Sequence, residues 1–407
     1  MKPNRLAFVA VAVVATASCM QQGPAERYGF VALLGNDTVS LESVTRSGNT
    51  LTSDEVDRFP RVEERHTDVT LSPTGGIQHL VMDITTPSAP EAIRKRHIVA
   101  DVTSDSVIMT KRDTAYKRWA FATHGATVVA HVPQMYSLYE LYFAAARKRF
   151  AASPSQPGDT VPLRQFYIDR QFDRFPLGHA TLRRMQGDTE QVWHDWLAGI
   201  GSATVDSAGR LQHYSGAGTT YKVDVTRLSQ PPNVAPVAAQ FAALETKEGP
   251  ARELSVRGVV HDSIGAAEIT VDYGRPLVRG RQLLGGVVPF GEVWRTGANA
   301  ATQLTTSSPI TLAGLDLPAG TYTLWTLPKP GDVELIVNKQ FGQWGTEYNP
   351  ARDLGRARMT SDSSNAPVEQ FTISFVPKNA QSATLAMAWG PFRWTAPIVA
   401  RPAAHGR

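Results

Sequence analysis

Residues 321–337 read TYTLWTLPKPGDVELIV, and this stretch decides the fold class of the C-terminal part of the chain. Two runs that suit half-buried strands, 321–327 and 333–337, flank Pro330-Gly331-Asp332, which has the residue types of a tight turn. The pattern predicts an antiparallel hairpin. With six similar runs, eight segments predict strands: Ala267–Tyr273, Ala301–Thr306, Ile310–Leu312, Thr321–Leu327, Val333–Val337, Val368–Phe375, Ala383–Trp389 and Phe392–Val399. Strands at this spacing predict an antiparallel β-sandwich over residues 251–402.

A family resemblance rests on blocks around this hairpin. The blocks are DYGRP (272–276), RGR (279–281), GGVVPFGEVWRTGAN (285–299), Ala301-Thr302, LPAGTY (317–322), Asn338-Lys339, GQWG (342–345), PVEQFT (367–372) and Ala388-Trp389. In this order and at this spacing, about residues 253–400 resemble the bacterial family called domain of unknown function 2911. The resemblance implies a secreted or lipid-anchored β-sandwich of the bacterial envelope with no established reaction. It covers nothing before residue 253.

Residues 28–228 are typical of a second β-rich domain. Short alternating runs are separated by turn residues, as in Gly35-Asn36-Asp37. Runs 69–71 and 77–82 predict one antiparallel hairpin, and runs 202–205 and 210–214 predict another. We therefore expect a mainly antiparallel β domain over residues 28–228.

One segment of this domain predicts a helix instead. Apolar residues recur at helical spacing between Met135 and Phe150, while Glu140, Arg147 and Lys148 fall elsewhere around the helix. An antiparallel β domain with one amphipathic helix resembles the clamshell folds of envelope lipid-handling proteins. Residues 229–250 then predict a linker, with a proline-rich extended spacer over 229–237 and a short helix over 238–245.

The N-terminus predicts export. Lys2 and Arg5 precede a short apolar stretch, which indicates a signal peptide over residues 1–18. Small residues before Cys19 resemble a lipobox, so we expect Cys19 to be lipidated and residues 19–27 to form a tether. Met20 follows in place of an inner-membrane retention signal, and we expect the outer membrane rather than the inner, facing the periplasm or the exterior. Cleavage after Ala15-Thr16-Ala17 is the alternative, and it would release a soluble secreted protein.

Composition excludes several classes of function. The 407 residues carry a net charge of +4 and a single cysteine. One cysteine cannot form an intrachain disulfide, a cysteine-rich zinc site or a dithiol redox pair. So small a positive surplus over this length gives no nucleic-acid footprint. The partners we expect are the membrane, through the lipid anchor, and an acidic small molecule or glycan, with no nucleic acid.

Basic residues and glycines gather in the loops after residue 274 and predict a ligand site. Arginine offers planar donors for carboxylate or phosphate, and glycine lets backbone approach a ligand closely. Trp344 lies between glycines, where an aromatic face can stack on a sugar ring. The alternative is that the arginines pair with Asp262, Asp272 and Glu292 to fix the loops. The candidate ligand-binding residues are Arg275, Arg279, Arg281, Arg295, Asn299 and Trp344.

Catalytic chemistry has little support in the sequence. His261-Asp262-Ser263 contains the residue types of a triad, but neighbours on a strand point to opposite faces and cannot form the relay. Eight of the ten histidines lie in the first domain, unpaired at ligand spacing. We predict no catalytic residue, metal or cofactor. The function we expect is a ligand-binding module for an acidic sugar, lipid headgroup or peptide; the alternatives are a structural or protein-interaction module and a hydrolase of unrecognised type.

Overall fold

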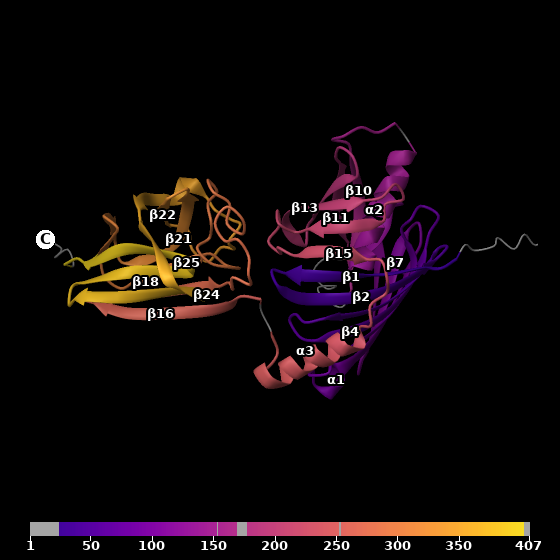
Figure 1. The fold of residues 1–407 in the computed structure, drawn as a ribbon, viewed down its shortest axis with the longest axis horizontal. Helices are drawn as coiled ribbons and strands as arrows, with labels where there is room; N and C mark the ends of the chain where they lie inside the picture. Colours follow the sequence, from indigo (N-terminus) through magenta and orange to yellow (C-terminus); the bar gives the residue numbers. More distant parts are fainter. Residues whose placement is uncertain (1–23, 153, 169–176, 252–253, 403–407) are drawn as a thin grey trace, which may run out of the picture.

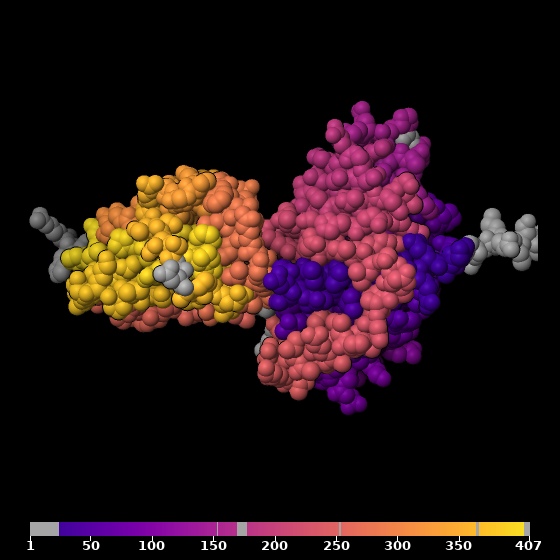
Figure 2. All heavy atoms as spheres, in the orientation of Figure 1, coloured from indigo at the N-terminus to yellow at the C-terminus, as the bar shows by residue number. Residues whose placement is uncertain are grey.

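The computed structural model describes residues 24–152, 154–168, 177–251 and 254–402. The predicted signal peptide and Cys19 lie outside the described residues. Two lobes lie side by side, and Figures 1 and 2 show that they meet over a narrow junction. None of the helices in the described part of the chain is long and apolar enough to cross a bilayer.

The larger lobe is the N-terminal domain, built on one sheet of 15 strands. The first eight strands are β1 (Glu26–Leu34), β2 (Asp37–Ser47), β3 (Thr50–Asp57), β4 (Glu63–Leu71), β5 (Ile77–Thr85), β6 (Lys95–Val102), β7 (Ser106–Arg112) and β8 (Tyr116–Ala122). The other seven are β9 (Val128–His131), β10 (Thr160–Tyr167), β11 (Gly178–Arg184), β12 (Thr189–His194), β13 (Leu197–Val205), β14 (Leu211–Ser215) and β15 (Asp224–Leu228). A short helix, α1 (Glu91–Arg94), connects β5 to β6.

The sheet is a meander whose first and last strands meet at its centre. Its order is β8-β7-β6-β5-β4-β3-β2-β1-β15-β14-β13-β12-β11-β10-β9, and among its pairs only β9–β10 is parallel. Both hairpins predicted in this domain are confirmed, as β4–β5 and β13–β14. The pairing of β1 with β15 therefore joins two arms of the sheet, and within each arm the strands follow one another in sequence.

The helix predicted from residue 135 is α2 (Tyr136–Ala151), and the sheet wraps around it. In Figure 1 it lies behind β10 and β11, and it contacts β1, β2 and β9 as well. Twelve of its 16 residues are buried. Glu140, which the sequence pattern places away from the apolar face, is also fully buried. A helix enclosed by a curved sheet has no wide solvent face, so its polar residues also need partners in the protein.

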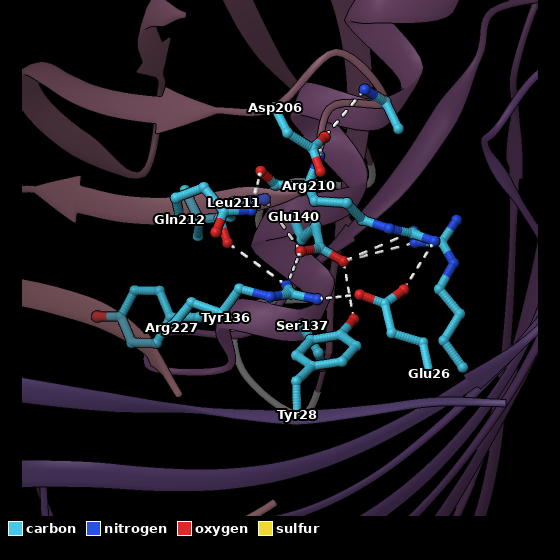
Figure 3. Close-up of polar contacts among 12 residues, drawn as sticks. Glu26, Tyr28, Tyr136, Ser137, Glu140, Asp206, Arg210, Leu211, Gln212 and Arg227 are labelled. Carbon is cyan, nitrogen blue, oxygen red and sulfur yellow. Dashed lines mark hydrogen bonds and ion pairs between the residues drawn. The ribbon is translucent and has the colours of Figure 1, made fainter. Parts of the chain in front are cut away.

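Glu140 meets these partners on β1, β14 and β15 (Figure 3). It accepts hydrogen bonds from Tyr28 Oη at 2.8 Å, from the Leu211 backbone N–H at 3.0 Å and from Arg227 Nη1 at 2.7 Å. Arg46 and Arg210 lie within 3.9 Å of the same carboxylate. Burial raises the pKa of Glu140 above its usual range, while the arginines favour the charged form. We call Glu140 with these three arginines the Glu140 cluster; it ties α2 to the centre of the sheet.

A second buried carboxylate holds the start of α2. Glu42 on β2 accepts hydrogen bonds from the backbone N–H groups of Tyr136 and Ser137, each at 2.9 Å, and from the Ser137 hydroxyl. Helix N-termini have unpaired N–H groups and favour negative charge. Desolvation nevertheless raises the pKa of Glu42 to about 7.

The predicted linker is largely helical and packs on the N-terminal domain. Helix α3 (Ala235–Glu248) begins three residues earlier than expected, inside the segment predicted as an extended spacer. Pro236 lies in its first turn, where a missing N–H costs no hydrogen bond. Phe241 packs with Leu41 and Val56, and Glu245 accepts a hydrogen bond from the Val62 N–H at 3.0 Å. Most of residues 229–250 therefore belong to the N-terminal domain.

The smaller lobe is the antiparallel sandwich predicted from residues 321–337. Its six-stranded sheet runs β16 (Val256–Ile264), β17 (Ala267–Arg275), β18 (Thr302–Thr306), β21 (Gly320–Lys329), β22 (Asp332–Asn338) and β23 (Asp353–Arg358). Its four-stranded sheet runs β20 (Leu315–Leu317), β19 (Ile310–Leu312), β25 (Ser382–Ala400) and β24 (Thr360–Asn379). A single 3₁₀ turn (Pro350–Arg352) precedes β23. The quoted stretch forms the β21–β22 hairpin, and the mainly β fold class is confirmed.

The strand predictions differ from the structure in three strands and one break. Strands β16, β20 and β23 were not predicted; β16 lies at a sheet edge and alternates only between exposed and half-buried residues, so its apolar signal is weak. The break expected between Trp389 and Phe392 is a local irregularity, because β25 continues through Gly390, whose φ is +54°. Trp325 and Trp389 are buried.

Candidate functional site

The two domains are joined where the β1–β2 turn meets the loop after β17. The Asn36 N–H donates to the Arg279 carbonyl oxygen at 2.9 Å, and the Arg279 guanidinium is ion-paired with Asp37. Gly35 has φ +64°, and a Cβ there would collide with that same carbonyl oxygen. The turn Gly35-Asn36-Asp37 therefore connects β1 to β2 and also contacts the second domain.

A cleft of about 400 Å³ opens beside this junction. The N-terminal domain contributes Leu34, Leu197 and the segment 219–222 to its lining. The C-terminal domain contributes loops within 276–299, together with Trp344 and Trp389. Its volume falls within the range of about 300–1,000 Å³ typical of small-molecule sites, which also occur preferentially at domain interfaces.

The loop between β17 and β18 forms most of this lining, and three of its residues have positive φ angles. Arg279, Thr296 and Asn299 have φ values of +52°, +53° and +62°, in a region that L residues other than glycine rarely adopt. Thr296 is fully buried, and its carbonyl oxygen accepts a hydrogen bond from Thr302 Oγ1 at 2.7 Å. Strained residues persist where the surrounding contacts fix them, and they concentrate at ligand sites.

Packing beneath the loop keeps this conformation rigid. The Trp294 ring stacks on Trp389 with centroids 5.5 Å apart and an interplanar angle of 9°. Gly345 lies against the Arg295 side chain, and a Cβ there would collide with Arg295 Cδ. The glycines of GQWG thus allow the two loops to lie close enough for Arg295 and Trp344 to share the cleft.

Three basic side chains converge on the cleft without a carboxylate partner; we call Lys222, Arg281 and Arg295 the cleft cations. Each donates to backbone oxygen: Lys222 Nζ to Ala217 at 2.7 Å, Arg281 Nη2 to Leu277 at 2.6 Å, and Arg295 Nη1 to Asn299 at 3.3 Å. Across the described residues, none of the three makes an ion pair. Glu292 is the one acidic residue among the described ones that line the cleft.

The charges of the cleft cations act on one another. Burial lowers the pKa of Lys222, and the nearby charges of Arg295 and Arg281 lower it further. Burial likewise lowers the pKa of Arg281, with Arg279 as the next cause, and burial lowers the pKa of Arg295. Positive charge is therefore concentrated in a partly desolvated concave surface, which is the electrostatic condition for binding an anion.

The structure brings together five of the six residues singled out from the sequence. Arg279, Arg281, Arg295, Asn299 and Trp344 all line the cleft. Arg275 does not line it; its guanidinium donates to the Phe371 carbonyl oxygen at 3.2 Å and to Thr372 Oγ1 at 3.1 Å, which ties β17 to β24.

The remaining five have different contacts in the cleft. Trp344 is 48% exposed, whereas Asn299 donates its side-chain N–H to the Ser255 carbonyl oxygen at 3.3 Å. Among the described residues, the three carboxylates considered as alternative partners form no ion pair with the candidate arginines. Asp272, for example, pairs with Arg257 at 2.8 Å. The partner of Arg279 is instead Asp37, in the other domain.

Sequence reasoning missed the contribution of the N-terminal domain to this cleft. Lys222 and Tyr221 follow the irregular stretch after β14. They are far in sequence from the arginine loops and carry no motif. The partly apolar segment 219–223 between two short strands was the only available signal, and it does not reveal which surface of the second domain it meets.

Four histidines of the first domain are paired with aspartates. His66, His79 and His97 each place Nδ1 2.7 Å from an aspartate on a neighbouring strand: Asp54, Asp101 and Asp83 respectively. His213 is paired with Asp224 at 2.9 Å. Within the part of the chain that the structure describes, no group of three or more metal-ligating side chains comes together. These pairs are cross-strand contacts on the exposed face of the sheet.

The fold and the cleft define a two-domain β protein with a basic cleft at its domain junction. Residues 255–398 match the family described as Protein of unknown function (DUF2911), which confirms the resemblance of the C-terminal region. A comparison with curated proteins finds no match.

Two solved structures are similar to parts of the chain. A DUF1089 family protein from Pseudomonas aeruginosa is 14% identical, with a TM-score of 0.33, over 45% of this chain and 93% of that one. A beta-barrel-like protein of domain of unknown function DUF1849 from Brucella abortus is 10% identical, with a TM-score of 0.32, over 50% of this chain and 94% of that one.

Proposed function

We propose that this protein is a binding protein whose interdomain cleft holds the anionic group of a small molecule. The observation that carries the proposal is the convergence of Lys222, Arg281 and Arg295 on one concave surface without a carboxylate partner. Withdrawing unpaired charge from water is unfavourable, and a bound anion would offset that cost. An acidic sugar, a lipid headgroup and a peptide carboxylate all present such a group.

Titration with anionic probes tests the proposal. Glucuronate, glycerol phosphate and N-acetyl-dialanine represent the three ligand classes; glucose, glycerol and N-acetyl-dialanine amide are their uncharged counterparts. Because Trp294 and Trp344 line the cleft, intrinsic tryptophan fluorescence is a suitable readout. We expect at least one anionic probe to bind while its uncharged counterpart does not.

Variants assign the binding to the cleft. Arg281→Gln and Arg295→Gln are each expected to weaken binding about tenfold, the loss typical of one charge-assisted hydrogen bond. Arg358→Gln is the matched control, because Arg358 lies in the same domain, is largely exposed and pairs with Asp332 at 2.8 Å. Equal affinity of the wild-type protein and both cleft variants for every probe would refute the proposal.

We also propose that the protein is a lipoprotein of the bacterial envelope, anchored through Cys19. The signal-like segment and the small residues before Cys19 support this. Mass spectrometry of the mature N-terminus is the test. A diacylated Cys19 is expected, and Cys19→Ser should release the protein into the soluble fraction. An unmodified N-terminus at Ser18 would contradict lipid anchoring and support secretion.

A further inference from the structure

A second cavity, of about 230 Å³, lies inside the N-terminal domain. We call it the aromatic chamber, because much of its lining is formed by Tyr136, Tyr139, Trp196, Tyr214 and Tyr221. Tyr139 and Tyr214 meet edge to face, with ring centroids 5.1 Å apart. Aromatic faces and edges arranged in this way are suited to hold another ring.

The aromatic chamber adjoins the cleft. Leu197, Tyr221 and Leu254 line both cavities. Tyr221 and Lys222 are neighbours in sequence, so the boundary between the two cavities is also the place where the cleft cations begin. The two cavities are therefore neighbours, and a ligand that spans both would pass these three residues.

Two buried histidines give the chamber its polar character. His131 and His194 line it, are 4% and 3% exposed, and have ring centroids 4.8 Å apart. His131 Nε2 and His194 Nδ1 have no hydrogen-bond partner among the described residues. Buried polar atoms are usually paired, so unpaired nitrogens on two residues that line one cavity are the atoms of the chamber most in need of a hydrogen-bond partner.

Hydrogen bonds behind His131 fix which of its nitrogens carries the proton. The Gln165 amide N–H donates to Tyr167 Oη at 2.9 Å and to Asp195 at 2.8 Å, so its carbonyl oxygen accepts the Tyr142 hydroxyl proton at 2.7 Å. Tyr142 has then used its only proton, and its 3.3 Å contact with His131 requires Nδ1–H to donate.

The protonation state completes this assignment. Burial, together with the neighbouring His194, lowers the pKa of His131 well below its usual range, so the ring is neutral at pH 7. In this tautomer Nε2 carries a lone pair and can only accept a hydrogen bond. The chamber therefore presents an acceptor, within aromatic walls, to whatever enters it.

We infer that the ligand is an amphipathic anion whose apolar end carries a ring with a hydroxyl group, held in the aromatic chamber by a hydrogen bond to His131 Nε2. The inference rests on the proposed function for the anionic end, which the cleft cations would bind. A hydroxyl is suited to the inner end because it can donate a hydrogen bond to His131 Nε2. The ring excludes water and stacks on the aromatic lining.

Two matched series of probes test the inference. The first consists of alkanoates of increasing chain length that end in a para-hydroxyphenyl ring, and the second consists of the same alkanoates with a plain phenyl ring. We expect the hydroxylated probe of the best chain length to bind the wild-type protein about tenfold more tightly, because the plain ring leaves the buried nitrogens unpaired. This comparison needs no variant. Equal affinities for the two series would overturn the inference.

Variants separate the inference from the proposed function. His131→Phe keeps an aromatic ring but removes the acceptor, and it should abolish the preference for the hydroxyl while both probes still bind. Arg295→Gln should weaken both series equally and leave the preference intact. His97→Phe, on the exposed face of the sheet, is the control and should change neither.

The outcomes distinguish two kinds of failure. If both series bind through Arg295 but His131→Phe keeps the hydroxyl preference, His131 does not bind the hydroxyl of the ring. The inference is then wrong, while the proposed function stands. If Arg281→Gln and Arg295→Gln leave all binding unchanged, the proposed function is wrong and the inference falls with it.

Discussion

The Glu140 cluster and the cleft cations are two groups of basic side chains that differ in whether carboxylates pair with them. In the cluster, three arginines surround a buried carboxylate that also accepts hydrogen bonds from Tyr28 and the Leu211 backbone. In the cleft, Arg281 and Arg295 meet only backbone oxygens. In the first arrangement carboxylates offset part of the positive charge inside a domain, whereas in the second the positive charge accumulates beside a cavity. The contrast separates arginines that hold the fold from arginines available to a ligand.

Removing the charge at each place should therefore have unequal effects. Glu140→Gln removes the carboxylate that pairs with Arg46 and leaves Arg210 and Arg227 with Glu26 alone, and we expect the free energy of unfolding to fall by about 3 kcal/mol. Arg295→Gln removes a charge with no counter-ion, and we expect a change within about 0.5 kcal/mol. Urea denaturation of both variants measures the difference. Equal destabilisation by the two substitutions would contradict the claim that the Glu140 arginines hold the fold and the cleft arginines do not.

Two other buried groups, one in the aromatic chamber and one at the start of α2, respond to acid with opposite signs. His194, in the aromatic chamber, has its pKa lowered to about 4 by burial. The unfolded chain therefore binds more protons between about pH 6.5 and pH 4, and this group makes the fold less stable as pH falls through that range. Glu42, which holds α2, has its pKa raised to about 7. The folded state then binds more protons between about pH 7 and pH 4.5, so this group makes the fold more stable as pH falls.

Denaturation at pH 7 and pH 5 tests these opposite signs. We expect His194→Gln to reduce the loss of stability on acidification by about 2 kcal/mol and Glu42→Gln to increase the loss. A change in the same direction for both variants would contradict the assignment of a neutral histidine in the chamber.

The smallest effect is expected on the exposed face of the sheet. The hydrogen bond to Asp54 raises the pKa of His66. Stability from the charged pair is then present below the unfolded pKa of about 6.5 and is lost as pH rises through the raised folded value. Both side chains are about half exposed or more, so we expect Asp54→Asn to cost less than about 0.5 kcal/mol at pH 6 and nothing measurable at pH 9. A larger cost that persists at pH 9 would show a role other than charge pairing.

The sequence predicts most of the fold because alternation and turn residues are local signals. The β21–β22 hairpin, helix α2 and both hairpins of the first domain follow directly from such patterns. The burial of Glu140 does not follow, because a helical projection shows one apolar face and cannot show that a curved sheet covers the other side. The edge strand β16 was missed because strand edges carry little apolar pattern.

The candidate site was likewise predicted only in part from the sequence. The glycine-rich arginine loops were recognised because their residues lie close together in sequence, and Arg281, Arg295 and Trp344 do share one cavity. Arg275 was included by proximity in sequence alone, and its contacts with β24 are made on a different side of the loop. Lys222 and the two chamber histidines were not assigned, because their role depends on how two distant segments of chain meet.

The measurement that tests the central claim most directly is the location of bromide ions by anomalous scattering in crystals of the full chain. We predict bromide at the cleft cations, which form no ion pair with the described residues, and none at Arg46, Arg210 and Arg227, whose charge is largely offset by Glu140 and Glu26. Bromide at the Glu140 arginines with an empty cleft would contradict the assignment of the cleft as the anion site.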